Sequence, residues 1–227
     1  MSLYENSWKL YKAATENLDF DYKYYLDFSR HYKTLDLCAG FGRVSNYLVE
    51  HGVDVTAVEL EDEFIPFLKL NKDKIQHANI LDLTGDNQFD RVISPYNSFC
   101  LFTGSSVDKF FDMLSKVLRP DGLASISYYH QKHWYHLDEG EWNFILDGEE
   151  FTYTFDFSKD KSDSFWLDRF KLLSSGEVIE HKYPISIYDD FSELDIYCNK
   201  YGLVMTEIVK HNYTLEPGWY DIIIRKI

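Results

Sequence analysis

The sequence predicts an α/β protein with a mostly parallel, doubly wound sheet, and three observations support this fold class. Residues 34–48 combine an apolar strand, a glycine turn and a helix. From there to residue 130, apolar runs of strand length alternate with stretches of helical periodicity, which is typical of βαβ units. Between residues 141 and 187, apolar and polar residues alternate without helical stretches, which indicates an added antiparallel sheet.

The N-terminal residues 1–33 are predicted to form a helical cap. Apolar side chains recur at helical spacing at Trp8, Tyr11 and Ala14. More aromatic residues follow between residues 20 and 28. We expect most of these side chains to pack on the sheet.

The first strand of the main sheet is predicted at residues 34–38, and Gly40 and Gly42 form the turn that follows it. Glycine has no Cβ, so these positions allow both a tight bend and the close approach of a ligand. The next helix is expected to end at Gly52. A strand that leads through glycines into a helix N-terminus is typical of a nucleotide-binding site.

An acidic residue, Glu59, stands at the end of the next apolar run, residues 53–58. A carboxylate at this place can accept two hydrogen bonds from a ribose diol. Because a strand-end acid contributes little to packing, we expect Glu59 to serve a ligand and the fold to survive its removal.

The remaining elements follow in order. The sequence predicts helices starting at 62–68, at 105–118 and at 188–201. It predicts further strands of the main sheet at 75–80, 89–94, 123–129, 203–212 and 219–227.

Composition limits the possible partners and the cell compartment. The chain has 227 residues and a formal net charge of −15, without the clustered basic residues that a nucleic-acid partner requires. No apolar run is long enough to span a membrane, and the first residues do not resemble a signal peptide. The three cysteines, Cys38, Cys100 and Cys198, lie far apart and suggest reduced thiols in a cytoplasmic protein.

Two classes of cofactor site share the strand–turn–helix geometry, and Ser45 and Asp36 distinguish them. A dinucleotide site requires a third glycine where Ser45 stands, for close packing of the helix on the strand. It does not require an acid inside the strand, yet Asp36 lies there. A nicotinamide-dependent oxidoreductase is therefore the weaker alternative.

The stretch instead resembles motif I of class I S-adenosylmethionine (SAM) methyltransferases of the small-molecule type. The motif reads D-x-G-x-G-x-G followed by a small or basic residue; Asp36, Gly40 and Gly42 match it. Arg43 matches the basic position, and Cys38 replaces the first glycine. Because cysteine is small, we expect a slightly altered cofactor pose, with binding retained.

The resemblance implies a Rossmann-like, seven-stranded sheet in the order 3-2-1-4-5-7-6, with the last strand antiparallel. Residues 34–130 and 188–227 would form the SAM-binding domain. Residues 1–33 would be its N-terminal helical cap, and residues 131–187 an inserted antiparallel β region.

The resemblance also implies cofactor contacts by position. An acid at the place of Asp82 commonly accepts a hydrogen bond from the adenine amino group; the alternative is an ordinary aspartate that caps the next turn. Hydroxyl groups of the cap often face the methionine end of SAM, which makes Tyr22 a candidate, with Arg30 beside it. The complete predicted set is Asp36, Cys38, Gly40, Gly42, Arg43, Glu59, Leu60, Leu81, Asp82, Ser94 and Tyr22.

A second resemblance competes at residues 94–96. Amino-directed DNA methyltransferases carry [N/D/S]-P-P-[Y/F] there, and Ser94, Pro95 and Tyr96 lack the second proline. The acidic net charge also opposes a DNA substrate. The loop is more similar to those of small-molecule methyltransferases.

For catalysis, His130 is the candidate general base, because it ends a predicted strand at the cofactor edge and titrates near neutrality. An ordinary polar residue at a strand end is an equally good interpretation. His130, His133 and His136 also form an H-x-x-H-x-x-H series, but no cysteine or carboxylate pair completes a metal site, so we expect no metal.

Together these observations favour a SAM-dependent methyltransferase that acts on a nitrogen or oxygen atom of a small molecule. The alternatives are a non-catalytic SAM-binding protein and, less favoured, the nicotinamide-dependent oxidoreductase. The expected partner is the small-molecule acceptor, with no nucleic acid and no membrane. We expect the cap and the inserted β region to shape the acceptor pocket, with one aromatic face of the insert against that pocket or against a second subunit. Two aromatic faces would favour a homodimer.

Overall fold

The computed structural model describes residues 7–85, 87–129, 141–158, 163–188, 190–212 and 217–227. Its main sheet has seven strands, in the order β10-β11-β5-β4-β1-β2-β3. Their bounds are β1 Lys33–Leu37, β2 Asp54–Glu59, β3 Ile75–His77, β4 Phe89–Ser94, β5 Leu118–Tyr129, β10 Leu203–Asn212 and β11 Pro217–Lys226. Strand β11 runs antiparallel to both of its neighbours, and the other pairs are parallel. The predicted Rossmann-like sheet order is confirmed.

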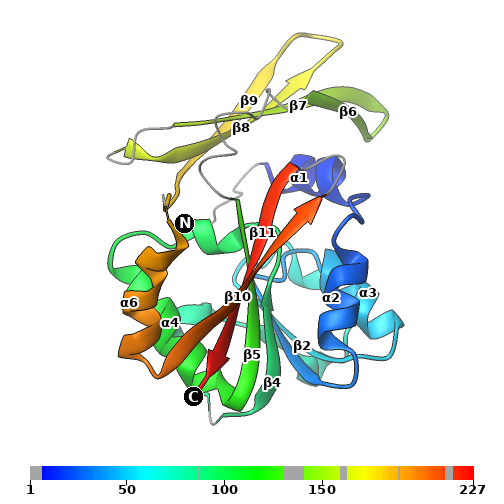
Figure 1. Cartoon of the computed structure of the whole chain (residues 1–227). Helices are drawn as coiled ribbons and strands as arrows, with labels where there is room; N and C mark the ends of the chain where they lie inside the picture. Colours follow the sequence, from blue (N-terminus) through cyan, green and yellow to red (C-terminus); the bar gives the residue numbers. More distant parts are fainter. Residues whose placement is uncertain (1–6, 86, 130–140, 159–162, 189, 213–216) are drawn as a thin grey trace.

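Helices cover both faces of this sheet (Figure 1). Helices α2 (Tyr22–Ser29) and α3 (Arg43–Glu50) bury Leu26, Val44 and Leu48 against the strands on one side. On the other side lie α4 (Ser105–Val117) and α6 (Asp195–Lys200), where α4 places Phe110 and Leu114 in the larger core. Short 3₁₀ helices occur at Ile65–Phe67, Lys72–Lys74, Ile80–Asp82, Ser98–Leu101 and Phe191–Leu194.

The prediction that a helix starts at residues 62–68 is wrong, because only the 3₁₀ turn Ile65–Phe67 forms there. The cause is the Asn46 side chain of α3. Its amide nitrogen donates to the Phe67 carbonyl at 3.0 Å, and its oxygen accepts from the Lys69 N–H at 2.7 Å. These are backbone groups that a longer helix would need for its own hydrogen bonds.

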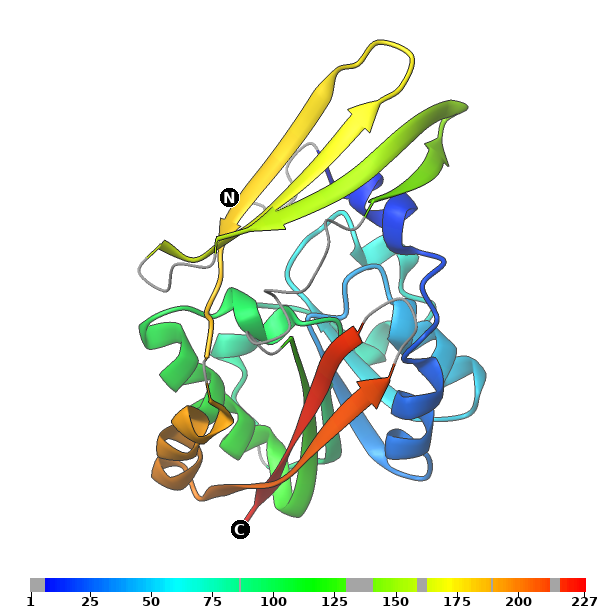
Figure 2. The same ribbon diagram turned by 45° about the horizontal axis from the view of Figure 1, so that its top comes forward.

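A second sheet has four antiparallel strands in the order β6-β7-β8-β9, and it lies over one end of the main sheet (Figures 1 and 2). The strands are β6 Glu141–Leu146, β7 Glu149–Phe157, β8 Phe165–Leu172 and β9 Val178–Pro184. Helix α1 (Trp8–Thr15) packs against it, and the Trp142 indole donates to the Ala14 carbonyl at 2.9 Å.

The two faces of this second sheet differ in polarity. The inward face buries Tyr153, Phe155 and Phe170 together with residues of α1. The outward face carries charged side chains, among them Arg169, which pairs with Glu180 and Asp156. The predicted antiparallel insert is therefore confirmed, with one aromatic face and one polar face.

A buried hydrogen-bond network ties the cap to the C-terminal strands. The carboxylate of Asp221 on β11 is 1% exposed. It accepts hydrogen bonds from Tyr25 of α2 at 3.0 Å and from Ser125 of β5 at 2.6 Å. His211 of β10 lies 2.9 Å from the other carboxylate oxygen of Asp221.

None of the helices in the described part of the chain is long and apolar enough to cross a membrane.

Candidate functional site

The glycine turn lies between the end of β1 and the start of α3. Three of its residues have left-handed backbone conformations, with φ of +56° at Cys38, +57° at Gly40 and +86° at Gly42. A left-handed conformation explains why a glycine is more usual at the position of Cys38.

The two glycines serve different purposes. A Cβ at Gly42 would lie 2.8 Å from both the Asn46 amide and the Leu68 side chain. A Cβ at Gly40 would meet nothing within 4 Å. Gly42 is therefore required by the packing of the protein itself, whereas Gly40 faces open space beside the turn.

Glu59 binds the turn directly. Its Oε2 accepts from the Gly40 N–H at 2.6 Å, and its Oε1 accepts from the N–H groups of Leu60 and Glu61 at 2.8 and 2.9 Å. The side chain is 6% exposed. The expectation that Glu59 contributes little to the fold is wrong, because its carboxylate organises three backbone groups. A carboxylate has about four acceptor sites, so one remains available to a ligand.

Asp36 of β1 is buried, at 1% exposure. Its Oδ2 accepts a 2.6 Å hydrogen bond from Ser45, which accounts for the serine that replaces a third glycine. Among the described residues, no group donates a hydrogen bond to its Oδ1, and the buried Ser94 hydroxyl likewise has no partner. Burial raises the pKa of Asp36 to about 7.

Arg43 is held by the cap. Its guanidinium binds both carboxylate oxygens of Asp21, at 2.6 and 2.7 Å, and the Leu18 carbonyl at 2.9 Å. The Tyr22 ring lies 5.5 Å from this guanidinium and stacks on Tyr47. The basic residue of the predicted motif thus fastens the cap to the start of α3.

Two pockets lie along the glycine turn, and together they form what we call the glycine-turn pockets. One is lined by Tyr11, Asp36, Cys38, Gly40, Arg43, Tyr96 and Ser98, among others. The other is lined by Tyr11, Cys38, Gly40, Glu59, Leu60, Phe64, Asn79, Leu81 and Ser98, among others.

The structure thus brings together Asp36, Cys38, Gly40, Arg43, Glu59, Leu60 and Leu81 of the predicted cofactor residues. Four others, Tyr22, Gly42, Asp82 and Ser94, are not in direct contact with these pockets, although each adjoins residues that line them, and their roles stay predictions. Arg30 lies with Lys33 and Asp54 at the other end of the sheet, where β1 and β2 begin, which corrects its assignment.

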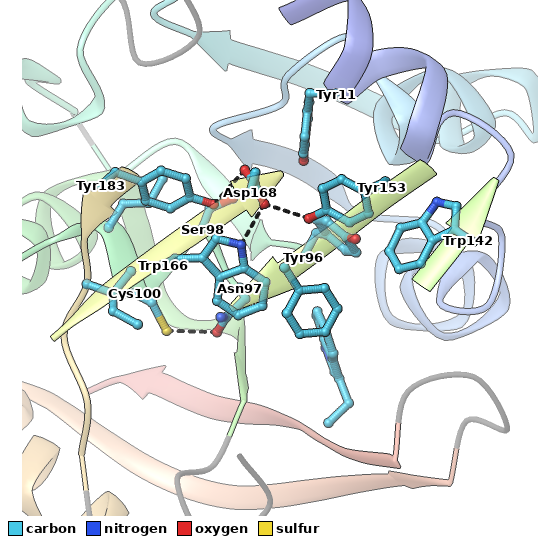
Figure 3. A pocket seen from close by; sticks show the side chains of 14 residues that line it. Tyr11, Tyr96, Asn97, Ser98, Cys100, Trp142, Tyr153, Trp166, Asp168 and Tyr183 are labelled. Atoms are coloured by element: carbon cyan, nitrogen blue, oxygen red, sulfur yellow. Dashed lines mark hydrogen bonds between the residues drawn. The ribbon is translucent and has the colours of Figure 1, made fainter. Parts of the chain in front are cut away.

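A third pocket, which we call the aromatic pocket, lies between the two sheets, with an empty volume of about 760 Å³. Figure 3 shows its walls, which come from α1, the loop after β4, the second sheet and β11. Tyr11 and Ser98 line all three pockets, so the aromatic pocket adjoins the glycine-turn pockets at these two side chains.

The loop after β4 forms the boundary between the pockets. Tyr96 and Asn97 have consecutive left-handed conformations, with φ of +53° and +62°. Such conformations are costly for residues with a side chain and tend to occur at functional sites. The Tyr96 ring stacks on Trp219, and the Cys100 thiol donates to the Asn97 side chain at 2.8 Å.

Sequence reasoning missed Tyr11 and Ser98. It expected an aromatic face of the second sheet at the acceptor pocket, but it did not identify which residues line the pocket. Tyr11 stood out only as part of a helical repeat, and nothing in the sequence says which strand of the second sheet faces the turn. The catalytic candidate His130, and His133 and His136 with it, lie outside the described residues. Among the residues that are described, no cluster could hold a metal ion.

Comparisons with known proteins agree with this geometry. Residues 34–122 match the family model of the methyltransferase domain. That segment, which is less than half of the chain, is therefore similar to methyltransferase domains. YqeM of Bacillus subtilis (strain 168), which is named as a methyltransferase, is 32% identical over 98 residues, or 40% of each chain. The chain thus spans about two fifths of the curated relative that it matches.

Solved structures extend the likeness to nearly the whole chain. A SAM-dependent methyltransferase from Clostridium acetobutylicum ATCC 824 superposes with a TM-score of 0.70 at 16% identity, over 95% of both chains. The sugar N-methyltransferase KedS8 from Streptoalloteichus sp ATCC 53650 gives 0.72 at 13% identity, over 96% of this chain and 91% of KedS8. CalS10 of Micromonospora echinaspora, an amino pentose methyltransferase, gives 0.68 at 12%, over 98% and 93%. The fold is that of the SAM-dependent methyltransferases.

The residues around the glycine turn fit SAM. Asp36 presents a buried carboxylate oxygen without a hydrogen-bond donor, where a cationic group would be accommodated. Gly40 leaves open space at the turn, and Glu59 retains an acceptor site toward the same pocket. These three residues would hold the cofactor.

Proposed function

We propose that this protein is a methyltransferase that uses SAM to methylate a nitrogen or oxygen atom of a small molecule. The observation that carries the proposal is the junction at Tyr11 and Ser98, where the glycine-turn pockets meet a separate pocket lined by aromatic side chains. A cofactor and an acceptor need this arrangement, since they must meet at one point while each keeps its own site.

The protein's own contribution is to bind and orient. When bound, SAM supplies a sulfonium methyl that is already activated. Glu59 and the glycine turn fix the cofactor, the loop after β4 separates the two sites, and the aromatic side chains exclude water from the acceptor. Orientation of this kind can lower a barrier by about 7–11 kcal/mol in favourable cases.

The lining of the aromatic pocket supports a small acceptor. Small-molecule sites are usually lined by apolar and aromatic side chains with a few polar groups. KedS8 and CalS10, which share the fold, act on a sugar nitrogen and an amino pentose according to their names. The formal net charge of −15 weighs against nucleic acid as the acceptor.

The test has two parts. Calorimetric titration with SAM, NAD and NADP should show binding of SAM alone; tight binding of NAD or NADP would favour the oxidoreductase. Formation of S-adenosylhomocysteine should then be measured against a panel of small amines and alcohols. SAM binding without turnover on any member of a broad panel would favour the non-catalytic SAM-binding alternative.

A homodimer through residues 131–187 and a cytoplasmic location both stay predictions. The outward face of the second sheet carries the ion pairs of Arg169 with Glu180 and Asp156, a charged surface that a partner need not cover. Light scattering over a range of protein concentrations tests the dimer.

A further inference from the structure

Among the described residues that line the aromatic pocket, one carries a carboxylate, Asp168. Strand β8 presents Asp168 on the inward face of the second sheet, opposite Phe155 of β7 and His181 of β9 in the strand register. This carboxylate is therefore the source of negative charge that the described side chains bring to the pocket. The side chain is 1% exposed.

Three neutral donors fix this carboxylate. Its Oδ1 accepts from the Tyr153 hydroxyl at 2.6 Å and from the Trp166 indole N–H at 2.7 Å. Its Oδ2 accepts a longer bond of 3.4 Å from the Tyr183 hydroxyl. Figure 3 shows these bonds converging on Asp168 from β8 itself and from the neighbouring strands β7 and β9. Burial raises the pKa of Tyr153, so the phenol keeps the proton that it donates.

No cation within the described part of the chain forms an ion pair with Asp168. The neighbouring Arg169 lies on the outward face and pairs with Glu180 and Asp156. His181 shares the inward face, but burial lowers its pKa, which keeps the imidazole neutral. Among the described residues, the buried Asp168 carboxylate is therefore hydrogen-bonded but has no opposite charge paired with it. Buried charges of this kind are costly unless a partner neutralises them.

The surrounding rings favour a positively charged partner. Trp142, Tyr153, Trp166, Tyr183 and Trp219 all line the pocket. The faces of tryptophan and tyrosine attract cations, most strongly where water is excluded. Burial raises the pKa of Asp168 to about 6, so near neutral pH the group is an anion inside an aromatic enclosure.

We propose that the aromatic pocket binds an amine-bearing small molecule, whose ammonium group is held between Asp168 and the aromatic rings. This inference rests on the proposed function, because it assigns the acceptor class of that same pocket. An uncharged alcohol could donate a hydrogen bond to Asp168 but would leave its charge uncompensated. The site therefore discriminates by charge as well as by size.

The inference can be tested with two ring compounds of similar size, cyclohexylamine and cyclohexanol. At about pH 8 the amine is cationic and Asp168 is ionised. We expect calorimetry and tryptophan fluorescence to show at least about tenfold tighter binding of the amine. Equal affinity of the native protein for the two compounds would overturn the proposal without any need for a variant.

Asp168→Asn should remove this preference by weakening amine binding at least about tenfold, while cyclohexanol binding stays within about twofold. The matched control is Asp156→Asn, on the exposed outward face of the adjoining strand β7, which should keep the preference. Retention of the preference in folded Asp168→Asn would place the discrimination elsewhere and overturn the proposal. If Asp168→Asn fails to fold, the comparison on the native protein decides.

The same titrations separate this inference from the proposed function. They are run with and without S-adenosylhomocysteine, and the SAM affinity of each variant is measured. If the native protein does not bind SAM, the methyltransferase proposal is refuted. The affinities for the amine and the alcohol can still be compared in that case. Normal SAM binding with no amine preference would refute only the acceptor class.

Discussion

At the end of β2, the Glu59 carboxylate is positioned for two partners, the backbone of the glycine turn and a ligand. Its three backbone hydrogen bonds mean that a truncation would disturb both. An isosteric substitution is the better probe, since it keeps the shape and removes the charge.

We predict that Glu59→Gln weakens SAM binding by about 1.5–3 kcal/mol, the value typical of a hydrogen bond to a charged group. Stability should also fall, by about 1–3 kcal/mol, because the amide nitrogen cannot accept from a backbone N–H. Calorimetry and urea unfolding measure the two effects. Asp62→Asn, on an exposed side chain nearby, is the control, and an unchanged SAM affinity in Glu59→Gln would contradict the site.

At the glycine turn, Gly40→Ala and Gly42→Ala should fail in different ways. An alanine with positive φ is strained by about 1–3 kcal/mol. Gly42→Ala should destabilise the protein by more than this, because its Cβ would also collide with Asn46. Gly40→Ala should lose only the stability that corresponds to this backbone strain. It should also bind SAM more weakly. Gly52→Ala is the matched control, since Gly52 also has positive φ and open surroundings. Equal SAM affinity in the Gly40 and Gly52 variants would show that no ligand occupies the space beside Gly40.

Cys38→Gly should be tolerated, because it relieves a left-handed conformation at a residue with a side chain. We expect equal or higher stability and SAM binding that is retained or slightly tighter. Thermal unfolding and calorimetry measure both. A severe loss of SAM binding would mean that the motif is misaligned at this position.

The ionisation of Asp36 should appear in the pH dependence of stability. Burial raises its pKa from 3.8 to about 7, so between these values the native state binds a proton that the unfolded state has lost. Its contribution to stability must therefore fall as pH rises from about 4 to about 7, and stay constant above. The difference in unfolding free energy between native protein and Asp36→Asn, measured in urea across this range, should show that fall. A flat difference would contradict the raised pKa.

Single residues of the glycine turn were predictable because their spacing is local. Asp36, Gly40 and Glu59 follow from strand ends and turns, which the sequence marks within a few residues. Asp168 was not predictable as a site residue. Its importance depends on three donors from three strands and on a sheet that folds back over the turn.

At the scale of elements, the Asp21–Arg43 pair joins the cap to α3, and both side chains are less than a tenth exposed. Breaking one partner of a buried pair leaves the other charge unpaired, so Asp21→Asn should destabilise the protein by about 3–5 kcal/mol. Hydrogen exchange should accelerate in α2. The exposed pair of Lys23 with Asp27 on the same helix provides the control, and Asp27→Asn should leave exchange unchanged. If Asp21→Asn is as stable as the native protein, the Asp21–Arg43 pair does not hold the cap on α3.

Helices and strands were predicted correctly where the periodicity of the sequence determines them. They were predicted poorly where a side chain from a distant part of the chain determines the local backbone. The alternation at residues 141–187 correctly predicted an added antiparallel sheet. Helical spacing at 62–68 misled, because the Asn46 amide holds that backbone in a short 3₁₀ turn. A competing hydrogen bond from another element leaves no local mark in the sequence.

At the scale of the whole molecule, α1 and the second sheet close over the main sheet, and Tyr11 lines all three pockets. S-adenosylhomocysteine should therefore slow hydrogen exchange in α1 as well as in the glycine turn. Strand β10, at the far edge of the sheet, should be unaffected and serves as the internal control. Protection that stops at the turn, with α1 unchanged, would show that the cap takes no part in holding the cofactor.

The hydrogen bond from Tyr25 to Asp221 joins residues that are 196 positions apart in the chain. A ribosome synthesises the cap at the start and β11 almost at the end, at about 5–20 residues per second. The cap therefore leaves the ribosome many seconds before its anchor exists. The fastening of α2 to β11 is therefore a late event in the synthesis of each new chain.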